Sequence, residues 1–122
     1  MDKEIKNAVI AVLDSIKPYE SGNRNENCYL TAYQIAVLLL KDKKIKKYMS
    51  DNGYPINIGG KGEGSYNSLS RAIAKDLAGE SDTFDMAFIN ITKGLEQFSF
   101  IDEKGRLSEP SVESISMFRL KK

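Results

Sequence analysis

The sequence predicts one α+β domain that is mainly helical and has a β-hairpin at its C-terminal end. Three observations lead to this prediction. Apolar residues recur at helical spacing in several segments, a capping box begins the most apolar of these, and a turn containing Gly105 separates two short β-like segments near the end. The length of 122 residues is typical of a single domain spanning residues 1–122.

The first predicted helix covers residues 1–17, with its apolar pattern beginning after Asp2. Pro18 follows, and a helix tends to end before a proline. Residues 18–28 are rich in Ser, Gly and Asn, so we expect a loop there. The apolar face of this helix consists of Ile5, Ala8, Val9, Val12, Leu13 and Ile16.

A second helix is predicted to begin at Thr31, whose capping box with Gln34 satisfies backbone N–H groups at the helix start. It is expected to continue to about Met49, with Gly53 just past its end. The N-terminal half is apolar nearly all round, which indicates a buried central element. The lysines of residues 41–47 spread around the helix, so a solvated helix end is favoured over a phosphate site.

Four further elements are expected along the rest of the chain. Residues 54–58 alternate like a short strand, and residues 66–78 form a third helix with Ser65 as its cap. In residues 84–98 apolar side chains recur every three or four positions over four turns, which predicts a fourth helix. The alternation at Phe84, Met86 and Phe88 also fits a strand, and Gly94 would cost a helix about 1 kcal/mol.

The C-terminal hairpin is predicted from residues 98–101, a turn over residues 102–106 and a second strand over residues 112–120. Its charged turn contains Lys104 and Arg106. The Asp102-Glu103 pair lies beside these two cations, so we interpret it as part of a solvated turn and not as a catalytic pair.

Composition argues against an enzyme, a metal site and a bound cofactor. The chain has no histidine, which is the commonest general base and metal ligand, and its single cysteine is Cys28. Residues 59–64 are glycine-rich but match neither the Walker nor the dinucleotide pattern, so we interpret them as a flexible connector of unassigned role. One cysteine and a charged N-terminus favour a cytoplasmic location, and no segment is long and apolar enough for a membrane.

The charge distribution is close to neutral, with a formal net charge of +1. Residues 1–58 carry nine Lys/Arg and seven Asp/Glu, whereas residues 59–122 carry nine and ten. A dedicated nucleic-acid binder usually has a clear basic excess. Any basic surface on this chain must therefore be local.

Two phrases resemble the winged-helix superfamily. SRAIAKDLA (residues 70–78) is similar to the first helix of a helix-turn-helix pair, and GLEQFSFIDEKGRL (residues 94–107) is similar to a recognition helix leading into a wing. The expected order from Thr31 onward also resembles this superfamily, in which a small strand after the first helix pairs with the wing. The resemblance covers residues 31–120 and implies a three-helix, winged-helix-like core, with residues 1–17 as an extra N-terminal helix.

The resemblance implies a DNA-binding protein, specifically a small transcriptional regulator. It places base and phosphate contacts on the third and fourth helices and on the wing. The alternative is a non-enzymatic protein-interaction module on the same fold, because Glu80, Asp82 and Asp85 lie where phosphates would approach. The N-terminal helix could also pair two copies into a homodimer. The candidate DNA-binding residues are Arg71, Lys75, Thr83, Asn90, Lys93, Gln97, Lys104 and Arg106.

Overall fold

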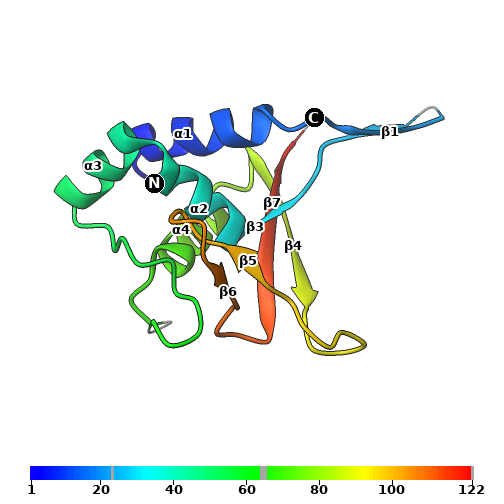
Figure 1. Ribbon diagram of the computed structural model, residues 1–122. Helices are drawn as coiled ribbons and strands as arrows, with labels where there is room; N and C mark the ends of the chain where they lie inside the picture. Colours follow the sequence, from blue (N-terminus) through cyan, green and yellow to red (C-terminus); the bar gives the residue numbers. More distant parts are fainter. Residues whose placement is uncertain (23, 64–65, 122) are drawn as a thin grey trace.

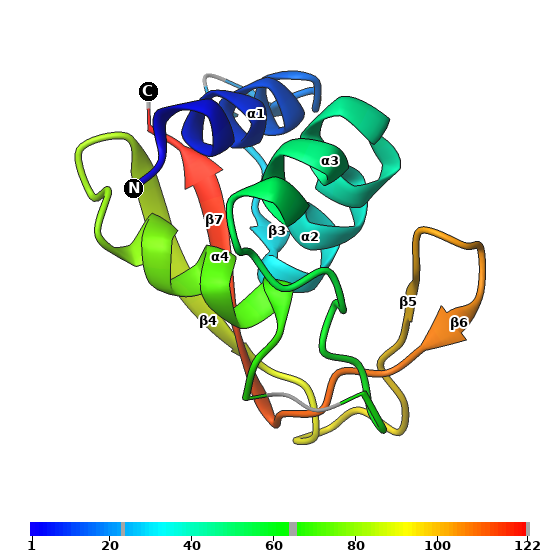
Figure 2. The same cartoon turned by 90° about the vertical axis from the view of Figure 1, so that its left-hand side faces the viewer.

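A computed structural model describes residues 1–22, 24–63 and 66–121 of the chain. It is an α+β structure, as the sequence predicts. Helices α1, α2 and α4 pack against an antiparallel sheet, in which the last strand of the chain, β7, pairs with both β3 and β4 (Figures 1 and 2).

Helix α1 (Lys3–Asp14) forms where the N-terminal apolar pattern predicts a helix. The carboxylate of Asp2 caps it by accepting the N–H groups of Glu4 and Ile5. Ile5, Val9 and Leu13 lie on one face and are buried in the core of the same chain. The apolar face that would be needed for pairing through this helix is therefore already covered within one copy.

The hairpin of β1 (Tyr19–Ser21) and β2 (Arg24–Glu26) occupies the segment expected to be a loop. It extends away from the helices, on the side of the C-terminus (Figure 1). The short strand β3 (Leu30–Thr31) follows and leads directly into the next helix.

Helix α2 (Ala32–Lys41) has the predicted capping box, in which Thr31 Oγ1 accepts the Gln34 N–H and Gln34 Oε1 accepts the Thr31 N–H. The single helix expected up to Met49 is wrong, because the chain is extended at Asp42 and a new helix, α3 (Lys43–Asp51), begins there. The Asp42 carboxylate accepts the N–H groups of Lys44 and Ile45 and so caps α3. The change of direction buries Met49 completely.

The strand predicted over residues 54–58 is absent, although this whole stretch is described. The backbone carbonyls of this stretch accept hydrogen bonds from a helix and not from a neighbouring strand. Asn57 and Ile58 accept the N–H groups of Leu69 and Ser70, the first residues of α4 (Leu69–Ala78). The cap of α4 is Ser68, whereas the predicted cap, Ser65, lies outside the described residues.

The helix predicted over residues 84–98 is also wrong. Strand β4 (Phe84–Asn90) pairs along its full length with β7 (Ser114–Leu120). Both periodicities are present in the sequence, and pairing with seven residues of β7 favours the alternating one. Gly94 has φ +75°, a left-handed conformation that no helix interior contains. Residues 91–99 are a turn and a loop.

The sheet has the strand order β3-β7-β4, and every neighbouring pair is antiparallel. A separate hairpin is formed by β5 (Phe100–Ile101) and β6 (Leu107–Ser108). The expected pairing of residues 98–101 with residues 112–120 is therefore wrong, because β5 closes on β6 and β7 closes on β4. Phe84 and Phe118 are buried where α1, α2 and α4 cover the sheet.

Candidate nucleic-acid interface

Helix α4 presents two cations to solvent. Arg71 and Lys75 are four residues apart, so their side chains leave the same side of the helix, and both are exposed. Ile73 and Leu77 are on the opposite side and are fully buried. Within the described part of the chain neither cation forms an ion pair with an acidic side chain, so both charges are available to a ligand on this face.

An aromatic ring supports Arg71. Its guanidinium carbon lies 4.4 Å from the centroid of the Tyr66 ring, in the geometry of a cation–π contact. Tyr66 is 81% exposed. The contact holds the guanidinium near the N-terminal end of α4, where the backbone N–H of Arg71 also donates to Ser68 Oγ.

A cavity of about 210 Å³ lies beside Arg71, between the first turns of α4, the start of α2 and strand β7. Serines line it on two sides, Ser70 of α4 with its N-cap Ser68, and Ser114 and Ser116 of β7. Hydroxyl and guanidinium groups donate hydrogen bonds to phosphate oxygens in protein–DNA contacts. The cavity thus places serine residues next to one of the two exposed cations.

The other candidate residues do not share a helix face, because residues 84–98 contain β4 and a loop. Asn90 ends β4, and its Oδ1 accepts the N–H groups of Thr92 and Lys93 at 3.0 and 2.9 Å. That oxygen forms the turn and is not directed at a ligand. Lys93 and Gln97 are exposed in the loop that follows, whereas Thr83 is half-buried before β4 and accepts the Lys121 N–H through its carbonyl.

The turn between β5 and β6 is organised around Asp102, which is buried. Its carboxylate accepts the backbone N–H groups of Lys104 and Arg106 and also the Arg106 Nε–H, at 2.8 to 3.0 Å. The hydrogen bond from the Arg106 N–H, followed by that from Lys104 and by the guanidinium, lowers the pKa of Asp102. Arg106 is therefore engaged within the turn, while Lys104 remains exposed.

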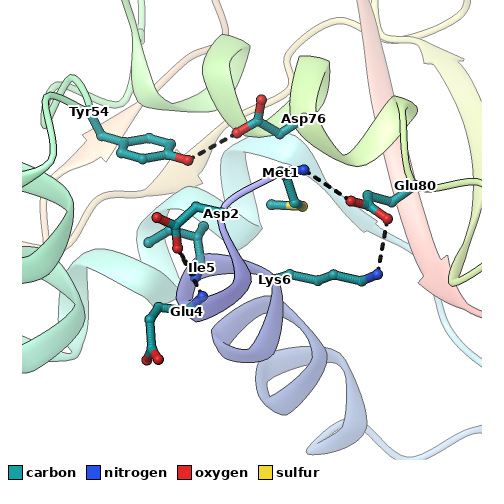
Figure 3. A network of polar contacts seen from close by, with 8 residues as sticks. All are labelled: Met1, Asp2, Glu4, Ile5, Lys6, Tyr54, Asp76 and Glu80. Atoms are coloured by element: carbon teal, nitrogen blue, oxygen red, sulfur yellow. Dashed lines mark hydrogen bonds and ion pairs between the residues drawn. The ribbon is translucent and has the colours of Figure 1, made fainter.

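Two of the three acids that weigh against phosphate binding are neutralised within the chain. Figure 3 shows Glu80 between the N-terminal ammonium of Met1 and the Lys6 ammonium, at 3.1 and 3.0 Å. Hydrogen bonding to Lys6, and then to the N-terminus, lowers the pKa of Glu80. Asp85 pairs with Arg119 at 3.1 Å. Asp82 is the exposed member of the three.

Sequence reasoning identified Arg71 and Lys75 but missed what surrounds them. It predicted a helix from residue 66, whereas α4 begins only at Leu69 and Tyr66 lies before it. The sequence could not predict that serines of β7 lie near Arg71, because this depends on a contact between segments about forty residues apart. The N-cap Ser68, three residues before Arg71, is the local sequence feature that could have located the start of α4.

Comparison with known proteins gives no match to a family model, a curated protein or a solved structure. Among the described residues, none of the helices combines the length and apolar character that a membrane span requires. The same part of the chain brings no three His, Cys, Asp or Glu side chains together as a metal site.

Proposed function

We propose that this chain is a winged-helix-type DNA-binding domain that contacts duplex DNA through the exposed face of α4. The observation that carries the proposal is the pair of exposed cations on α4, Arg71 and Lys75, where Arg71 lines a cavity together with four serines. A small transcriptional regulator is the function that this domain type favours.

The strand arrangement supports the proposal. A small strand, β3, follows the first helix and pairs with β7, while β7 pairs with β4. In the winged-helix superfamily a small strand after the first helix pairs with the wing. Under this proposal α1 is the first helix of the core and not an extra helix, and α4, whose sequence resembles the first helix of the pair, is the helix that reads DNA. The wing is the β4–β7 hairpin with residues 91–113 at its tip.

The charge distribution favours α4 over the wing as the main contact with DNA. Residues 91–113 contain three Lys/Arg and five Asp/Glu, and Arg106 is already paired with Asp102. The wing therefore offers Lys93 and Lys104 as its exposed cations, next to an excess of acids. Since phosphate neutralisation supplies much of the affinity for DNA, we expect weak, strongly salt-dependent binding centred on α4.

The test is fluorescence anisotropy with mixed-sequence duplex DNA at about 50 and about 200 mM salt, a range over which phosphate contacts weaken measurably. The double variant Arg71→Ala/Lys75→Ala is expected to bind at least about tenfold more weakly at the lower salt. It should also reduce the slope of log affinity against log salt by about 2, one unit for each phosphate contact.

The matched control is Lys43→Ala/Lys44→Ala, which removes the same charge from exposed positions on α3. We expect this variant to keep most of the affinity, because its lysines lie on a different helix. Equal losses in the two double variants would show a general charge effect and would contradict an interface on α4. An absence of duplex binding by the wild type at the lower salt would overturn the proposal and favour the protein-interaction alternative.

A further inference from the structure

Strand β4 lies at the margin of the β3-β7-β4 sheet, with β7 on one side (Figure 1). Among the described residues no strand pairs with its other side. Proteins usually protect such an edge with lysine, proline or a bulge. Residues 84–90 contain no lysine and no proline, and their pairing with β7 is continuous over all seven residues, without a bulge.

The backbone hydrogen bonds show which groups of β4 point outward. The Lys121 N–H donates to the Thr83 carbonyl, and the Ile91 N–H donates to the Glu113 carbonyl, both at 3.0 Å. Bonded pairs alternate along an antiparallel ladder, so the odd-numbered residues of β4 bond to β7. The N–H and C=O groups of Met86 and Phe88 consequently point away from β7 and toward solvent.

The side chains on this edge are apolar and nearly free of charge. Phe88 is 68% exposed and Met86 is 41% exposed. Asp85 is the one charged residue of the strand, and Arg119 of the same chain neutralises it at 3.1 Å. Two such edges can therefore approach each other without opposing like charges.

We propose that β4 pairs antiparallel with β4 of a second copy of this chain, around a two-fold axis at Ala87. This register places Met86 opposite Phe88 of the second copy, and Phe88 opposite Met86. Both are outward-pointing positions, so the pairing forms four backbone hydrogen bonds from groups that are otherwise exposed. The two three-stranded sheets join into one of six strands.

A two-fold axis at Ala87 brings the two exposed apolar side chains of this edge, Met86 and Phe88, onto each other. Each of the two symmetric contacts brings a methionine sulfur against an aromatic ring, which is a favourable contact in proteins. An interface of this kind uses one surface on both copies and closes as a dimer. The inference concerns assembly alone and does not depend on binding to DNA.

The first test measures the oligomeric state of the full chain by sedimentation velocity, from about 1 μM to about 1 mM, the range of weak association. The wild type is expected to move from monomer to dimer, with no larger species. Phe88→Lys should remain monomeric at least about tenfold higher in concentration, because a lysine on the edge opposes pairing.

Leu107→Lys is the matched control, because Leu107 is 65% exposed on the separate β5–β6 hairpin. It should dimerise as the wild type does. Circular dichroism of both variants checks that each is folded. A wild type that stays monomeric over the whole range overturns the proposal, and so does equal weakening by the two substitutions.

The second test uses a disulfide to measure the register. In the proposed pairing Ala87 faces its own copy in a non-hydrogen-bonded pair, where Cα atoms lie about 4.5 Å apart, within the span of a disulfide. In a Cys28→Ser background, Ala87→Cys should form a covalent dimer in a glutathione redox mixture. Ile89→Cys, two residues along the same face, should not. Equal cross-linking of both variants, or of neither, contradicts pairing centred on Ala87.

Discussion

At the scale of the residue, polar side chains connect elements that the sequence separates. Tyr54 is an example, because its hydroxyl donates to Asp76 of α4 at 3.2 Å (Figure 3). Burial, followed by the negative charge of Asp76, raises the pKa of Tyr54 to about 12. The phenol thus keeps its proton in the folded chain at a pH where an unfolded tyrosine, near 10, loses it.

A pH dependence of stability follows from Tyr54. A group whose pKa is raised by folding stabilises the fold below its unfolded pKa and loses this contribution as the pH rises through the folded value. The wild type should therefore lose unfolding free energy relative to Tyr54→Phe as the pH rises from about 10 to about 12. Urea unfolding at a series of pH values measures it.

Asp76→Asn provides a second measurement on the same contact. Removing the carboxylate charge should lower the pKa of Tyr54, which the ultraviolet absorbance of the phenolate reports when titrations are compared with Tyr54→Phe. A phenolate titration that is unchanged in Asp76→Asn would contradict the role given to that charge.

At the scale of the element, Asp42 determines where one helix stops and the next begins. Its carboxylate accepts the N–H groups of Lys44 and Ile45 at 3.0 and 3.3 Å, which α3 would otherwise leave without helical partners. Aspartate offers the backbone an alternative to a continuous helix. The resulting break allows Ile45 and Met49 to pack against the core.

Loss of this cap should have a measurable cost. Asp42→Ala is expected to lower the free energy of unfolding by about 1 kcal/mol, the usual value for an N-cap. Asp42→Asn removes the charge but retains the capping oxygen, so it should stay close to the wild type. Chemical denaturation of the three proteins tests this, and an Asp42→Ala protein as stable as the wild type would show that packing alone fixes the break.

At the scale of the whole molecule, β7 holds the fold together. It is the last strand in sequence but the central strand of its sheet, between β3 and β4. Phe118 lies opposite Leu30 on one neighbour and Met86 on the other, and it is completely buried. The helices α1, α2 and α4 all contact β7. Damage at this strand therefore affects every layer of the structure.

Phe118→Ala should destabilise the chain by about 3–5 kcal/mol, through lost burial and the cavity that remains. This is a large part of the roughly 5–15 kcal/mol that stabilises a typical domain. Met117→Ala is the control, because Met117 is half-buried and points to the other side of the same strand. Thermal unfolding should show a clearly smaller loss for Met117→Ala, and equal losses would contradict a core centred on Phe118.

The sequence by itself determined the local features. The start of α2 was predictable, because the contacts of its capping box, between Thr31 and Gln34, span three residues. The exposed positions of Arg71 and Lys75 were also predictable, since helical periodicity separates them from Ile73 and Leu77. The hairpin turn after residue 101 was predictable from its glycine and charged residues.

The tertiary structure alone decided the features that depend on distant partners. Residues 84–90 satisfy both a helical and an alternating pattern, and only β7, which begins at residue 114, makes the strand the stable choice. Residues 54–58 alternate like a strand, yet their carbonyls bond to the start of α4 because no strand lies beside them. The serines beside Arg71, and the free edge of β4, likewise exist only once β7 is in place.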